Sequence, residues 1–99
     1  MKRAVRILRS AQGDLSEIAT YLRREMSGAA ERVIEDILRG IDRLGELPES
    51  GPVPRDERLR RLGFRYLARG HYLVFYKVTR AHVRIYRVLH QRRAYERLL

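Results

Sequence analysis

The chain has 99 residues and no cysteine, so we expect one domain over residues 1–99 with a single modest core, and disulfides and thiolate metal sites are excluded. Its formal net charge is +10, from 22 Lys and Arg residues against 12 Asp and Glu residues. No apolar run reaches the roughly 18–20 residues that a membrane span needs, and the N-terminus has no apolar signal-peptide core, so we expect a cytoplasmic protein without a membrane partner.

The first third of the chain predicts a strand followed by a helix. Residues 3–9 alternate loosely, which places Val5 and Ile7 on one face of a short strand. We expect Ser10 to be the N-cap of the next helix, because its hydroxyl can accept a hydrogen bond from a free backbone N–H. The helix that follows has an apolar stripe, and we expect it to end at Ser27-Gly28 with the glycine in a left-handed conformation. The stripe consists of Leu15, Ile18, Ala19, Leu22 and Met26.

A second amphipathic helix follows after a short connection. Its apolar positions run from Val33 to Leu44, and Pro48 ends it. Two helices joined this closely lie side by side as an αα-hairpin. Residues 48–58 contain all three prolines and predict a loop. We interpret both apolar stripes as core, in preference to a docking groove.

The second half predicts three strands. Residues 62–68 alternate between an apolar face and a mostly cationic one, and Arg69-Gly70-His71 forms the turn that follows. The segment from Tyr72 to Val78 is apolar on both faces, as expected for a central strand. A last strand runs from Val83 to Leu89, with a possible bulge after Tyr86, and Ala94–Leu99 is a short helix or a tail.

These elements give an α+β fold in the order β-α-α-β-β-β. The helical hairpin packs on one face of a small, mainly antiparallel sheet. We expect the other face of the sheet to be left for function.

Charge is segregated along the chain. Residues 1–54 hold nine basic and nine acidic residues, whereas residues 55–99 hold thirteen basic and three acidic residues. An arginine-rich genome would explain arginine in place of lysine, but it would not separate the two signs. The asymmetry therefore indicates one face built for an anionic partner, whether nucleic acid, an acidic peptide or an acidic protein groove.

The order of four motifs resembles the ParE branch of the RelE/ParE toxin superfamily over nearly the whole chain. The motifs are Ala11-x-x-Asp14-Leu15-x-x-Ile18-x-x-Tyr21, Pro48-x-x-Gly51, Tyr72–Val78 and Val83–Gln91. The resemblance implies the toxin of a type II toxin–antitoxin pair. It also implies a ParD-like antitoxin, whose flexible C-terminal segment folds onto the toxin. The basic second half of this chain predicts that this segment is acidic and amphipathic. ParE-like toxins poison DNA gyrase without enzymatic activity, whereas RelE-like members cut mRNA on the ribosome.

A metal-free ribonuclease needs a base, cations that stabilise the phosphorane, and an acid. RelE-like nucleases carry an arginine near the start of the central strand, where this sequence has Tyr72, and this difference favours the gyrase inhibitor. If the protein is nevertheless a nuclease, its catalytic candidates are Arg65, His90, Arg92, Arg93 and Tyr95. If it is not, we expect the target-binding residues to be Arg65, Arg84, His90, Arg92, Arg93 and Tyr95.

Two alternatives to a gyrase inhibitor remain open at this point. The first is a ribosome-dependent mRNA endoribonuclease, and the second is a basic nucleic-acid-binding module without toxicity. The sequence contains no metal-ligand motif, no glycine-rich phosphate loop and no nucleophile elbow. We therefore expect no metal, no cofactor and no small-molecule substrate.

Overall fold

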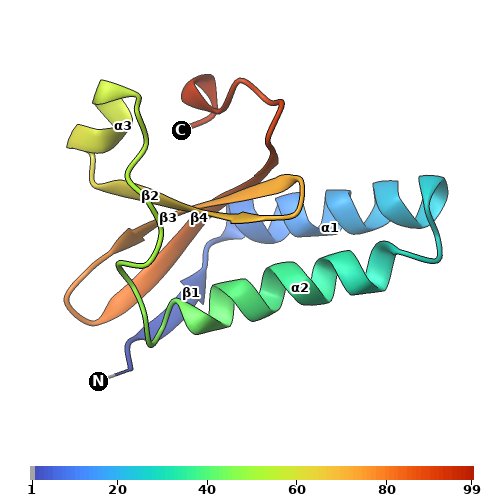
Figure 1. The fold of residues 1–99 in the computed structure, drawn as a ribbon, viewed down its shortest axis with the longest axis horizontal. Coiled ribbons are helices and arrows are strands. Elements are labelled where there is room, and N and C mark those ends of the chain that lie inside the picture. The colour runs from blue at the N-terminus through green and yellow to red at the C-terminus, as the bar shows by residue number, and fades with distance from the viewer. Residues whose placement is uncertain (1) are drawn as a thin grey trace.

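The computed structural model describes residues 2–99 and has the predicted order of main elements (Figure 1). A four-stranded sheet has the spatial order β1-β4-β3-β2, with β1 (Ala4–Ile7), β2 (Phe64–Arg69), β3 (Tyr72–Val78) and β4 (His82–His90). Strand β1 runs parallel to β4, and the other two pairs are antiparallel. The prediction of a mainly antiparallel sheet in an α+β fold is confirmed.

Two long helices, α1 (Arg9–Glu25) and α2 (Ala30–Arg43), form the predicted hairpin beneath the sheet in Figure 1. Two details of α1 were predicted wrongly. Leu8 is its N-cap, and the Ser10 hydroxyl donates instead to the Tyr86 carbonyl, 2.6 Å away. Gly28 is not left-handed, since Gly63 and Gly70 alone have a positive φ within residues 2–99.

The core between the helices and the sheet is made by the two apolar stripes and by alternate strand residues. Its fully buried members include Ile37, Ile41, Val74, Tyr76 and Ile85. Gly40 of α2 has a packing reason, because a Cβ there would lie 2.8 Å from Arg69 Nε and 2.9 Å from Leu67 Cδ2. This glycine leaves room on α2 for the side chains of Leu67 and Arg69 of β2.

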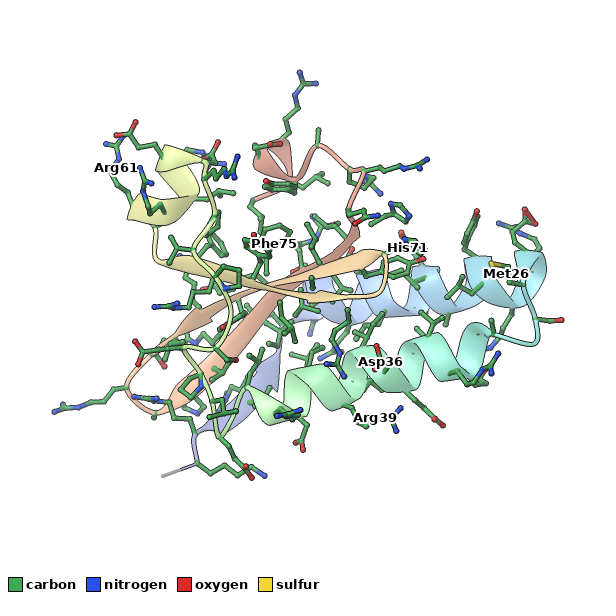
Figure 2. The ribbon with its side chains drawn as sticks, in the orientation of Figure 1. Met26, Asp36, Arg39, Arg61, His71 and Phe75 are labelled. Atoms are coloured by element: carbon green, nitrogen blue, oxygen red, sulfur yellow. The ribbon has the colours of Figure 1, made fainter. Side chains whose placement is uncertain are left out.

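We had expected the opposite face of the sheet to be open, but part of it is covered. A short helix, α3 (Glu57–Arg61), and the C-terminal segment with the 3₁₀ helix η1 (Tyr95–Arg97) cover part of it (Figures 1 and 2). Together they bury a second apolar cluster around Phe75 and Leu59, neither of which is exposed. The prediction of a plain loop over residues 48–58 missed the start of α3 at Glu57.

Strand β4 changes faces in the middle. The β3–β4 register shifts between Phe75 and Tyr76, and Tyr86 is left without a register partner on β3. Consequently Val83, Ile85 and Val88 all belong to the core on the helix side. The predicted bulge after Tyr86 is confirmed, and it interrupts the regular alternation of side chains along β4. None of the helices within residues 2–99 has the length and apolar character needed to cross a membrane.

Candidate functional site

The C-terminal end of β4 gathers histidine and tyrosine rings. His90 lies opposite Tyr72 in the β3–β4 register, and the Tyr72 ring meets its imidazole edge-on at 5.4 Å. The His71 ring is nearly parallel to the His90 ring, with 6.0 Å between their centroids. The backbone N–H of Arg92 donates to His90 Nδ1 over 3.1 Å, so the neutral His90 ring carries its proton on Nε2. This tautomer presents an N–H donor from the end of the strand.

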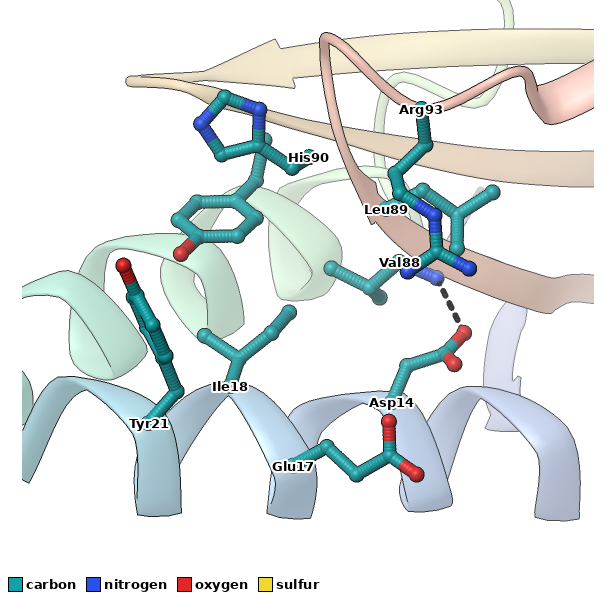
Figure 3. Close-up of a pocket in the computed structure, with 9 residues that line it drawn as sticks. Asp14, Glu17, Ile18, Tyr21, Val88, Leu89, His90 and Arg93 are labelled. Carbon is teal, nitrogen blue, oxygen red and sulfur yellow. Dashed lines mark hydrogen bonds between the residues drawn. The ribbon is translucent and has the colours of Figure 1, made fainter.

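A cavity of about 280 Å³, which we call the His90 pocket, lies between α1 and the end of β4 (Figure 3). Glu17 and Tyr21 enter it from α1, and His90 and Arg93 enter it from the β4 side (Figure 3). With Asp14 and Tyr72, which also line it, the pocket brings two carboxylates, two phenols, one imidazole and one guanidinium to a small volume. Sequence reasoning missed Glu17 and Tyr21, although their spacing from Asp14 places all three near one helix face.

Asp14 lies at the inner end of the same pocket but is fully engaged by the protein. Its two carboxylate oxygens accept from Arg87 Nε and Nη2, each over 2.8 Å. Oδ2 also accepts from the Val88 N–H over 2.9 Å, which is the bond drawn in Figure 3. The hydrogen bond to Asp14 raises the pKa of Arg87 above its ordinary value, although partial burial opposes the shift. We call Asp14, Arg87 and Val88 the Asp14 corner. Strand β1 pairs with β4 only as far as Ile85, and Asp14 accepts the backbone N–H of Val88 beyond that point. The role of the Asp14 corner is therefore structural.

A larger and more apolar hollow of about 380 Å³, the hairpin groove, adjoins the His90 pocket. The two share Tyr21, Tyr72 and His90. Tyr21 is 52% exposed, and Met26, at the far end of α1 in Figure 2, is 57% exposed. The predicted core stripe of α1 therefore ends at Leu22, and Met26 belongs to an open surface. An exposed apolar groove of this kind is suited to an apolar side chain of a partner.

The six residues predicted to form the site do not converge. Arg65 lies on the helix side of β2, where Nη1 donates to the Gly51 carbonyl over 2.8 Å and Nη2 lies 3.7 Å from Glu49. Arg84 is exposed near the other end of β4, before the bulge. These two arginines therefore lie apart from the His90 pocket.

The C-terminal candidates divide between two environments. The Tyr95 ring packs against Phe75 with 4.8 Å between ring centroids, and burial raises the pKa of its phenol above its ordinary value. Arg92 and Arg93 are exposed, and of these only Arg93 lines the His90 pocket. The structure thus brings His90 and Arg93 together and separates both from the Tyr95 hydroxyl.

The chemistry available in the His90 pocket is limited to hydrogen bonding, charge and proton transfer. Within residues 2–99, no group of three or more His, Asp and Glu side chains is arranged to hold a metal ion. The pocket can position an anionic or amide group between Arg93 and His90. A complete cleavage site would also need a second cation beside the reacting phosphate.

Comparisons with known proteins agree on the fold. The sequence model of the family described as the ParE toxin of the type II toxin–antitoxin system parDE matches residues 5–95. No curated protein sequence matches significantly. A chain of the chromosomal ParDE system from P. aeruginosa superposes with a TM-score of 0.74 at 20% identity, covering 90% of this chain and 96% of that one.

A chain of the toxin–antitoxin complex RelBE2 from Mycobacterium tuberculosis superposes with a TM-score of 0.69. It is 23% identical, and the alignment covers 91% of this chain and 99% of that one. Identities this low carry the fold alone. The four-stranded mixed sheet with its helices is therefore common to this chain and to proteins of both systems.

Proposed function

This chain belongs to the ParE toxin family of type II toxin–antitoxin systems, and we propose that it is a non-enzymatic inhibitor of DNA gyrase. The observation that carries the proposal is the dispersal of its candidate cleavage residues. Arg65 is bound to Gly51 and the Tyr95 ring is packed on Phe75, whereas His90 and Arg93 line the His90 pocket. Because gyrase acts on chromosomal DNA, the proposal also places the protein in the cytoplasm.

Dispersal matters because phosphoryl chemistry depends on groups held together around one phosphate. A base, an acid and the cations each act only within hydrogen-bonding reach of the reacting atoms. A protein that blocks its target by binding has no such requirement. It can use surface residues such as His90, Arg92 and Arg93 as separate contacts.

The direct test is a supercoiling assay with purified gyrase, relaxed plasmid and ATP. We expect the protein to inhibit supercoiling and to increase the amount of linear, cleaved plasmid. The double variant Arg92→Gln/Arg93→Gln should be a weaker inhibitor. Arg24→Gln/Arg43→Gln is a matched control, because it removes the same charge from exposed positions on the helices. Normal supercoiling without added cleavage at saturating protein would refute the proposal.

The proposal includes a ParD-like antitoxin with an acidic amphipathic C-terminal segment. Its apolar side chains would occupy the hairpin groove, and its carboxylates would meet the basic surface around Arg32, Arg69 and Arg93. The likeness in fold to a chain of a ParDE system and to a chain of a toxin–antitoxin complex supports a partner of this kind.

Co-expression with the proposed antitoxin tests which surface it covers. We expect Met26→Asp to remain toxic and to escape neutralisation, because a carboxylate in the groove repels an acidic segment. Leu38→Asp is the control, since Leu38 is also exposed on a helix but lines neither hollow. Neutralisation of both variants alike would show that the antitoxin binds elsewhere.

One observation favours a second candidate, the ribosome-dependent endoribonuclease. The His90 pocket contains an imidazole, a guanidinium and a carboxylate, which is part of an acid–base site. Primer extension on ribosome-bound mRNA after induction would then show new 5′ ends that disappear with His90→Asn. If the message stays intact while supercoiling is inhibited, this candidate fails and the gyrase proposal stands.

A further inference from the structure

Three cationic side chains lie in one row across three neighbouring strands. Arg6 of β1 is the register partner of Arg84 of β4, and Arg84 is the register partner of Lys77 of β3. The next position in the row, on β2, is Phe64. We call Arg6, Arg84 and Lys77 the cationic row.

The row lies on the face of the sheet that points away from α1 and α2. The strand neighbours of its members, Val5, Ile7, Val83, Ile85 and Val78, all pack into the core on the helix side. Since successive side chains of a strand point to opposite faces, the row points the other way. Arg6 and Arg84 are exposed there, and Lys77 is half-buried.

Like charges at directly opposed strand positions repel each other and reduce the stability of the sheet. Elsewhere on the sheet, arginines have carboxylate partners, as Arg87 has Asp14 and Arg69 has Asp36. Within residues 2–99, none of the three members of the row forms an ion pair or a side-chain hydrogen bond with another residue. The row is therefore an unneutralised concentration of positive charge.

We propose that the cationic row binds the phosphodiester backbone of double-stranded DNA. The inference rests on the proposed function, in which the protein acts on gyrase bound to its duplex. Three adjacent strands place their cations about 5 Å apart and about 10 Å from first to last, and one strand of B-DNA carries a phosphate about every 3.4 Å along its axis. The row thus offers three cations along a stretch of about four phosphates of one strand.

Two further observations favour a duplex over other anions. The aromatic rings beside the row are already covered, because Lys77 Nζ lies 4.6 Å from the Phe64 ring centroid and 5.1 Å from that of Tyr86. Unpaired bases would need free rings on which to stack. An acidic peptide would need an apolar anchor site, and only Lys77 of the row lines the adjoining hollow of about 360 Å³ near Leu62.

The test measures binding of a labelled 25-base-pair duplex by fluorescence anisotropy at several KCl concentrations, without gyrase. Three proteins are compared: wild type, the row variant Arg6→Gln/Lys77→Gln/Arg84→Gln, and the control Arg24→Gln/Arg39→Gln/Arg43→Gln. The two variants carry the same net charge, and all three control arginines are exposed on the helices. The double variant Arg6→Gln/Arg84→Gln retains Lys77 above the aromatic rings in case the triple variant fails to fold.

Log affinity falls with log salt, and we expect this fall to be less steep by about 2.7 in the row variant and by about 1.8 in the double variant. The reason is that each lost phosphate contact releases about 0.9 counterion fewer. At 0.1 M salt each lost contact corresponds to about an eightfold loss of affinity. The control should keep nearly the wild-type slope.

Equal losses in the row and control variants would overturn the proposal, since DNA would then be responding to net charge alone. An unchanged slope in the row variant would also overturn it. A third contrary result is loss of binding to labelled polyglutamate by the row variant with duplex binding intact, which would assign the row to an acidic protein. Duplex binding through the row without gyrase inhibition would refute only the proposed function.

Discussion

The cations on the two faces of the sheet have opposite surroundings. On the helix side and at the edge of β4, Arg65, Arg69 and Arg87 each have a partner within the protein. On the other face, Arg6, Arg84 and Lys77 are neighbours of one another. Arginine in a strand therefore indicates neither a site nor a scaffold by itself. The partner that the fold supplies decides the role.

The helices explain the difference between the faces. Helix α1 contributes Asp14 and α2 contributes Asp36, both of which face the sheet and pair with its arginines. The cover on the other face brings mainly apolar side chains and the cations of α3. Removing a paired cation or its partner should damage the fold, whereas removing an unpaired cation should damage only binding.

The largest effect is expected at the Asp14 corner. Asp14→Ala should lower the free energy of unfolding by about 3 kcal/mol, because it leaves the partly buried Arg87 guanidinium and the Val88 N–H without an acceptor. Urea denaturation would measure the loss. Glu17→Ala, an exposed carboxylate three residues along α1, should change stability by less than about 0.5 kcal/mol. Equal losses in the two variants would contradict the distinction between paired and unpaired charges.

A second large effect is expected at Tyr76, the register partner of Arg65 on β3. The buried Tyr76 hydroxyl donates to the Pro48 carbonyl over 2.8 Å and accepts from the Gly51 N–H over 3.0 Å. Tyr76→Phe should cost about 2 kcal/mol in urea denaturation, since two backbone groups of the loop lose their partner. Tyr21→Phe is the control, because Tyr21 is largely exposed. A Tyr76→Phe protein as stable as wild type would mean that Arg65 alone holds the loop.

The same tyrosine predicts a pH dependence. Burial raises the pKa of Tyr76 above its ordinary value of about 10, although the hydrogen bond from Gly51 opposes the shift. The unfolded chain then ionises before the folded one. The associated stability is complete below pH 10 and is lost as the pH rises through the folded pKa. The free energy of unfolding should therefore fall more steeply above pH 10 in wild type than in Tyr76→Phe, and parallel curves would contradict this.

Much of the fold could be predicted because its signals are local. The stripes of α1 and α2 and the two-sided apolar run of β3 follow directly from periodicity. The start of α3 was missed because five residues carry no periodic pattern, and the N-cap by Asp56 is a single side-chain contact. The change of faces at Tyr86 was expected only as an option, since a bulge depends on the partner strand.

The site was harder to predict because it depends on contacts between distant residues. Asp14 and Arg87 are 73 positions apart, and nothing local marks them as a pair. Arg65 and Arg84 were both predicted to bind the target, yet one faces the loop at Gly51 and the other faces Arg6 and Lys77. The cationic row exists only because the register of three strands aligns it. The sign of the charge was readable from the sequence, but its pairing was not.

The smallest effect, and the sharpest contrast with Asp14, is expected at Arg84. Arg84→Gln should raise the free energy of unfolding by a few tenths of a kcal/mol, because it relieves repulsion from both register partners, Arg6 and Lys77. The gain should shrink in high salt, since added ions screen the repulsion between exposed charges. Parallel urea titrations of wild type and Arg84→Gln at 0.05 M and 1 M NaCl would measure both quantities. A clear loss of stability would mean that Arg84 has a stabilising partner. The cations of this face would then stabilise the fold, as the paired arginines on the helix side do.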